Sequence, residues 1–169
     1  MSAGRPIVVY DCNVLLQSVL SDVGPAYQCL QLLEQGRVEL VMSTFVAEEI
    51  RDVLARPRIL QKNPHVTNER VASFLLLLAG RSRFVERITP EFKLPRDPKD
   101  EPYLNLAITA RAKHLVTWNE KHLTYLMDGK TSESIDFLAR FPYLQILSPP
   151  AFLDAMKKLS KVGRNEATE

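Results

Sequence analysis

Short apolar runs alternate along the chain with amphipathic stretches of helical period. The apolar runs predict five strands, near 6–10, 38–43, 83–88, 114–118 and 144–147. Strands that alternate with helices are typical of α/β folds, in which helices cover a largely parallel sheet. We therefore expect an α/β protein with a central, mainly parallel sheet of about five strands.

One predicted helix, over 67–79, has more apolar surface than a single buried face requires. Its main stripe comprises Val71, Phe74, Leu75 and Leu78. Leu76 and Leu77 lie outside this stripe. Either the helix contributes to an interface with a partner, or it is buried on both sides within the chain. The pattern leaves both alternatives open.

The length of 169 residues fits one domain. We assign this domain to 1–159 and expect a disordered tail over 160–169. The formal net charge of +2 is too small by itself to indicate a partner that is a polyanion. Neither a signal-peptide pattern nor a membrane span is predicted, so we expect a cytoplasmic protein. Cys12 and Cys29 lack the spacing of a zinc site and are expected to be reduced thiols.

The most informative residue is an acid at the end of the first predicted strand. Asp11 directly follows the apolar run 7–10. In open α/β sheets, ligands gather beyond the carboxyl ends of the strands, and a charge at that place escapes full burial inside the sheet. We therefore expect Asp11 to serve chemistry rather than packing.

Two adjacent acids, Glu48 and Glu49, belong to a predicted helix over 44–56. Successive residues of a helix are separated by about 100°. Glu49 falls beside the inner stripe of this helix, which is formed by Val46, Ile50, Val53 and Leu54. Glu48 points roughly the opposite way. Glu49 is therefore the candidate for the site, and the alternative is that it pairs with a neighbouring arginine or reaches solvent.

Polar residues also mark the following helix and strand. Asp100 leads the buried face of an apolar helix, so it is either an N-cap or a ligand. Thr117 and Asn119 alternate on one side of the chain where the fourth strand ends. The Asn119 side chain either supplies an oxygen ligand or caps a helix that begins at Glu120. His122 is either structural or available to a phosphate or a metal ion.

Together these residues resemble the PIN domain family, the metal-dependent ribonuclease fold of VapC-like toxins. The resemblance extends from about Ile7 to Leu153. It rests on Val-Val-Tyr-Asp-Cys-Asn-Val-Leu-Leu, Ala-Glu-Glu-Ile-Arg-Asp-Val-Leu-Ala-Arg-Pro, Arg-Asp-Pro-Lys-Asp and Leu-Val-Thr-Trp-Asn. It implies a three-layer α/β/α fold around a mainly parallel sheet.

The resemblance also implies a metal site. Asp11, Glu49 and Asp100 match the acids that bind metal in the family, and Asn119 stands where the family usually has a fourth acid. The site therefore carries one negative charge fewer, although an amide still offers an oxygen. Oxygen ligands favour Mg²⁺ or Mn²⁺ over zinc. Glu49 is expected to position or deprotonate the attacking water.

The implied activity is endoribonuclease cleavage, with Thr117 as a further catalytic residue and Asn13 and His122 as substrate-binding residues. RNA is expected to be steered by the basic residues Arg51, Arg56, Arg58, Lys62, Lys113 and Lys121. The resemblance to toxins of type II toxin–antitoxin pairs further implies a homodimer and a cognate antitoxin protein.

Other functions remain as alternatives. Because Asn119 replaces an acid, the chain is also compatible with a weakened PIN domain that binds RNA or a protein without cutting it. Haloacid-dehalogenase-like phosphotransferases also begin with a strand-end Asp, but they need a second acid where this chain has Asn13. Phospho-receiver domains are disfavoured because the last strand leads to 148–150 without their lysine.

Overall fold

The structure is a computed structural model that describes residues 4–166. The elements follow in the order β1 (Ile7–Tyr10), α1 (Cys12–Leu20), α2 (Pro25–Glu34), β2 (Glu39–Met42), α3 (Thr44–Leu54), α4 (Pro57–Lys62), α5 (Asn68–Arg81), β3 (Arg83–Phe84), α6 (Glu101–Thr109), β4 (His114–Val116), the 3-10 helix η1 (Thr124–Met127), α7 (Ser132–Arg140), β5 (Gln145–Leu147) and α8 (Pro149–Glu166). The alternation of strands and helices is the one that the apolar pattern predicts.

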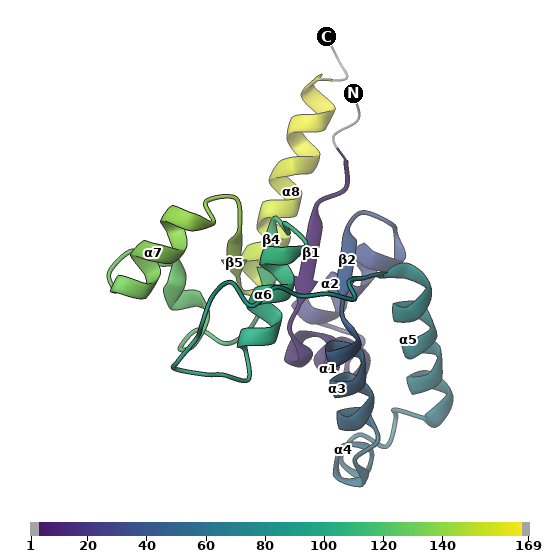
Figure 1. Cartoon of the computed structure of the whole chain (residues 1–169). Coiled ribbons are helices and arrows are strands. Elements are labelled where there is room, and N and C mark those ends of the chain that lie inside the picture. Colours follow the sequence, from purple (N-terminus) through teal and green to yellow (C-terminus); the bar gives the residue numbers. More distant parts are fainter. Residues whose placement is uncertain (1–3, 167–169) are drawn as a thin grey trace.

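The strands form one parallel sheet in the order β3-β2-β1-β4-β5. Helix α6 packs on one face of the sheet, and α2 and α8 contact each other on the other face (Figure 1). The Tyr10 hydroxyl marks that second face, since it donates to the Cys29 backbone oxygen of α2 at 3.0 Å. The structure thus confirms the expected three-layer α/β/α fold.

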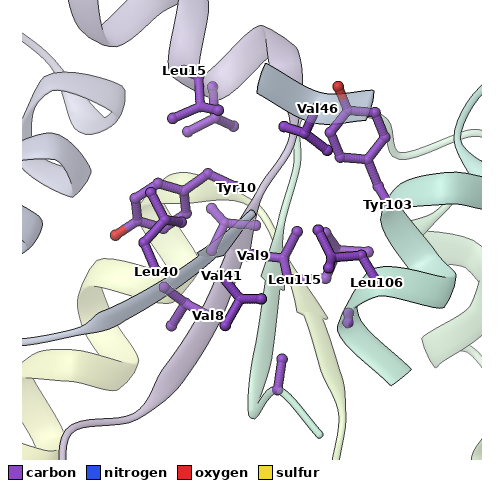
Figure 2. Packing of buried hydrophobic residues seen from close by; sticks show 14 of the residues in the cluster. Val8, Val9, Tyr10, Leu15, Leu40, Val41, Val46, Tyr103, Leu106 and Leu115 are labelled. Carbon is purple, nitrogen blue, oxygen red and sulfur yellow. The ribbon is translucent and has the colours of Figure 1, made fainter. Parts of the chain in front are cut away.

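The core lies between these layers. Figure 2 shows Val8, Val9 and Tyr10 of β1 packed among buried side chains from β2, β4, α1, α3 and α6. All three are fully buried or nearly so, as expected for the central strand of a parallel sheet. The scaffold that positions the strand ends is therefore apolar and closely packed.

Two predicted segments differ from the structure. The strand predicted over 83–88 comprises just Arg83 and Phe84, because it lies at the edge of the sheet and pairs only with β2. The segment 160–166, predicted as part of a disordered tail, continues α8. Ser160 anchors it, since the Arg37 guanidinium donates to the Ser160 hydroxyl at 2.7 Å. The remaining positions of the predicted tail, 167–169, lie outside the described residues.

Helix α5 leaves apolar surface uncovered. Leu76 is 73% exposed, whereas Phe74 and Leu78 are buried in the core. The helix is therefore not buried on both sides within the chain.

None of the helices described over residues 4–166 combines the length and apolar character that crossing a membrane requires.

Candidate active site

Asp11 lies at the carboxyl end of β1, on the face of the sheet that α6 covers. The register pairs Val9 with Leu115, so the next residues on the same face are Asp11 and Thr117. The Thr117 hydroxyl donates to Asp11 Oδ2 at 2.7 Å. Asp11 is only 3% exposed. The sheet thus produces a buried carboxylate that is held by a neutral donor.

Asp100 lies at the same edge of the sheet, because α6 begins there before the chain returns through β4. It occupies the N-cap position of α6, but its side chain does not cap the helix. Asp100 Oδ2 instead accepts a hydrogen bond from the Asn119 side-chain amide. Asn119 Oδ1 accepts from the His122 backbone N–H at 3.2 Å. The geometry therefore disfavours the N-cap alternative for Asp100.

Glu49 comes from α3, which starts where β2 ends because Ser43 Oγ accepts from the Val46 backbone N–H at 3.2 Å. The Glu49 carboxylate is half-buried and accepts a hydrogen bond from the Tyr103 hydroxyl. Within residues 4–166 it forms no ion pair, so the predicted alternative of an arginine partner is not found. Glu48 is exposed and lines a separate hollow between α3 and α5.

The carboxylates influence one another electrostatically. Burial raises the pKa of Asp11, and the nearby Glu49 carboxylate adds to this effect while the Thr117 hydroxyl opposes it. Burial raises the pKa of Asp100 to about 6, and the charges of Asp11 and Asp97 contribute further. These acids therefore share one region of negative potential, which favours cations.

The Cys12 thiol lies in the same group of side chains but is not suited to nucleophilic attack. Burial raises the pKa of Cys12 to about 12, and the Glu49 and Asp11 carboxylates act in the same direction. The thiolate is the reactive form, so Cys12 stays inert at neutral pH. Cys12 and Cys29 are both free and buried, as predicted.

The predicted substrate-binding residues flank these acids. Asn13 is exposed in the first turn of α1, two residues after Asp11. His122 is half-buried, and its positive charge would lower the pKa of Asp100, which places it beside that acid. Its Nδ1 is buried and has no hydrogen-bond partner in the described part of the chain. Asn13 is therefore available to a ligand at this edge, whereas Nδ1 of His122 is closed off from solvent.

The predicted basic residues are divided between the two ends of the sheet. Lys113 immediately precedes β4 and therefore lies at the amino edge, opposite the acids. It was predicted to steer RNA, and its position argues against that role. The other five are exposed on α3, on α4, beside these helices or in the turn after β4, and they are Arg51, Arg56, Arg58, Lys62 and Lys121.

The acids fit a divalent ion by their chemistry, although they do not form a ready-made cage. Among the described residues, no three Asp, Glu, His or Cys side chains converge closely enough to hold a metal ion. The electrostatic influence is pairwise, between Asp11 and Glu49 and between Asp11 and Asp100. Carboxylate oxygens are the ligands that Mg²⁺ and Mn²⁺ prefer, and a buried Asp11 without a cationic neighbour is a suitable first ligand.

Sequence analysis did not identify Tyr103 as part of the site. This residue follows Asp100 by three positions, so both lie on one face of α6. Tyrosine is apolar enough to belong to a buried stripe, but its hydroxyl needs a partner when it is buried. A tyrosine one turn after a candidate ligand was therefore the available signal.

A family model described as PIN domain matches residues 7–121, which is more than half of the chain and includes all the acids described above. PIN domains are in general nucleases and typically use divalent metal ions. No curated protein and no solved structure matches the chain.

Proposed function

Because the chain belongs to the PIN domain family, we propose that it is a metal-dependent endoribonuclease that hydrolyses RNA phosphodiester bonds. One observation carries the proposal. Asp11 is a nearly inaccessible carboxylate at the carboxyl end of the central strand, and it lies within the electrostatic range of both Glu49 and Asp100. A site of this charge repels a phosphodiester unless a cation reverses the local sign.

The proposed roles follow from the position of each side chain. Asp11 and Asp100 would hold Mg²⁺ or Mn²⁺, with Glu49 as a further ligand. A bound divalent ion supplies positive charge against the phosphate and makes water more acidic. Glu49 would orient the attacking water and take its proton. Thr117 and Asn119 would keep the two aspartates in place, as their hydrogen bonds already do.

The proposed substrate is single-stranded RNA. Arg56 supports this assignment. Its charge lowers the pKa of Cys12, which lies in the middle of the site, and its side chain is exposed. Asn13 and His122 would contact the RNA beside the scissile phosphate. Phosphate contacts of this kind position a nucleic acid without reading its sequence.

Cleavage of RNA with and without metal tests the function. We expect the purified chain to cut a labelled single-stranded RNA when Mg²⁺ or Mn²⁺ is present and to stop when EDTA is in excess. The readout is the appearance of shorter fragments on a denaturing gel. Absence of cleavage with either ion, across RNAs of varied sequence, would contradict the proposal.

Asn119→Asp is expected to tighten metal binding and to weaken the metal-free fold. A restored carboxylate beside Asp100 adds charge for the ion, so we expect the apparent Mn²⁺ affinity to rise about tenfold, the size of a 1.4 kcal/mol gain. Without metal, the hydrogen bond from the Asn119 amide is lost and two like charges face each other. Calorimetry with Mn²⁺ and thermal melts in EDTA measure the two effects.

The same variant separates the second candidate function. If the wild-type chain binds RNA without cutting it and Asn119→Asp cuts, the missing acid has turned this chain into a binding module. If the wild type cuts and the variant binds Mn²⁺ no better, the charge at this position does not limit the metal site.

We also propose that the chain is the toxin of a type II toxin–antitoxin pair, with an antitoxin and a second copy of itself as partners. Leu76 is exposed and supports a contact outside the site through helix α5, which Figure 1 shows at one side of the molecule. Expression of the wild type and of an inactive variant in a bacterial host tests the toxin role. Light scattering of the purified chain tests the dimer.

A further inference from the structure

Each of the three acids is held by a side chain that carries no charge. Thr117 donates to Asp11 and the Asn119 amide donates to Asp100. The third donor is Tyr103, whose hydroxyl donates to Glu49 Oε2. No cationic side chain in the described part of the chain pairs with any of these carboxylates. These neutral donors orient the three carboxylates and leave their negative charge available to a ligand.

Tyr103 is well fixed for this purpose. Its side chain is 1% exposed, and its ring lies 6.4 Å from the Phe45 ring in an edge-to-face arrangement. Figure 2 shows Tyr103 beside Val46 of α3, with the hydroxyl oxygen directed toward that helix. The ring therefore has little freedom, and the position of the hydroxyl is determined by packing between α6 and α3.

The protonation state of Tyr103 also suits a permanent donor. A tyrosine hydroxyl ordinarily loses its proton only at a pH of about 10. The hydroxyl therefore keeps its proton throughout the neutral range. A donor of this kind cannot neutralise Glu49, whereas an arginine in its place would form an ion pair and compete with a metal ion.

We propose that Tyr103 is a positioning residue that holds the Glu49 carboxylate toward Asp11 through Oε2, so that Oε1 is left for the ion and the attacking water. This inference rests on the proposed function, because the role of Glu49 is that of a ligand and base. Helix α6 thereby contributes twice to the site, through Asp100 at its N-terminus and through Tyr103 one turn later.

Tyr103→Phe tests the proposal, since it removes only the hydroxyl and keeps the ring. We expect kcat for RNA cleavage to fall about 10- to 100-fold, the usual cost of losing a partner of a metal-binding side chain. KM should stay within about twofold, because Tyr103 is buried and cannot touch RNA. Calorimetry of the metal-free chain with Mn²⁺ alone should show weaker binding by a similar factor.

Tyr10→Phe is the matched control. Tyr10 is also buried and also donates its hydroxyl, but its partner is the Cys29 backbone oxygen on the far face of the sheet. The control should lose stability without losing Mn²⁺ affinity or kcat. A general effect of a lost buried hydroxyl would instead appear in both variants.

A double-mutant cycle shows whether Tyr103 acts through Glu49. Tyr103→Phe should have little further effect in a Glu49→Gln background, because the carboxylate that it positions is gone. Additive losses of Mn²⁺ affinity and of kcat would overturn the positioning role.

The outcomes separate the two proposals. If the wild type cleaves RNA and Tyr103→Phe matches it in kcat and Mn²⁺ affinity, the inference about Tyr103 is wrong and the nuclease function stands. If the wild type binds Mn²⁺ without cleaving RNA, the nuclease function is wrong, and weaker Mn²⁺ binding by Tyr103→Phe still supports the positioning role. A wild type that neither binds Mn²⁺ nor cleaves overturns both.

Discussion

Asp11→Asn is expected to lower kcat/KM for RNA cleavage on the order of 10³-fold or more, because a metal ion at such a site contributes several kcal/mol to the transition state. Asparagine preserves the shape of the side chain and can still accept the hydrogen bond from Thr117. The substitution removes the charge and replaces one oxygen, which can accept from the backbone N–H groups of Cys12 and Asn13, by an amide nitrogen. The measurement is initial cleavage rate at saturating Mn²⁺ for wild type and variant.

Loss of folding is not expected to explain this effect. Burial raises the pKa of Asp11, so the folded state binds a proton more readily than the unfolded chain does. Stability therefore falls as the pH rises from the unfolded pKa through the folded pKa, and at neutral pH the ionised acid disfavours the native state. Asp11→Asn should melt in EDTA at a temperature equal to or above that of the wild type. A lower melting temperature, or full cleavage activity, would count against the assignment of Asp11.

Glu49→Gln is expected to reduce kcat on the order of 10²-fold, while Glu48→Gln leaves cleavage within about twofold of the wild type. The two residues are adjacent in α3 and undergo the same chemical change. Glu49 is half-buried and faces Tyr103, whereas Glu48 is exposed on the side of α3 that faces α5. Because the chemical change is the same in both variants, any difference between them reflects the direction in which the side chain points.

Calorimetry with Mn²⁺ provides an independent readout for this pair. Glu49→Gln should weaken Mn²⁺ binding, because Glu49 is a proposed ligand, whereas Glu48→Gln should bind Mn²⁺ as the wild type does. If Glu48→Gln loses activity and Glu49→Gln does not, the assignment of the inward-facing acid is reversed and α3 must present its other side to the substrate.

The carboxyl edge of the sheet could be predicted from local patterns. Asp11 follows an apolar strand, and helical periodicity distinguishes Glu49 from Glu48 without knowledge of the fold. The parallel sheet then follows from the alternation of strands and helices, which requires each connection to return to the same edge. These features depend on residues that are close in sequence, so the chain itself reveals them.

The partners of the acids could not be predicted in the same way. Tyr103 and Glu49 lie 54 positions apart, and their contact depends on how α6 packs against α3. From its position in the sequence alone, Asp100 fitted an N-cap better than a ligand, but the structure shows no capping bond and places Asn119 beside it. Lys113 has a charge suited to RNA, but only the strand direction shows that it lies at the wrong end. Such facts belong to tertiary packing, which no single stretch encodes.

The neutral donors around the acids should make activation by a metal ion fast and reversible. A carboxylate whose rotamer is already restrained loses little conformational entropy when an ion arrives, so less rearrangement separates the empty protein from the loaded one. The apolar interior in Figure 2 does not depend on that ion either. Chelation should therefore abolish cleavage while the protein stays folded. Addition of the ion should restore cleavage without a refolding step.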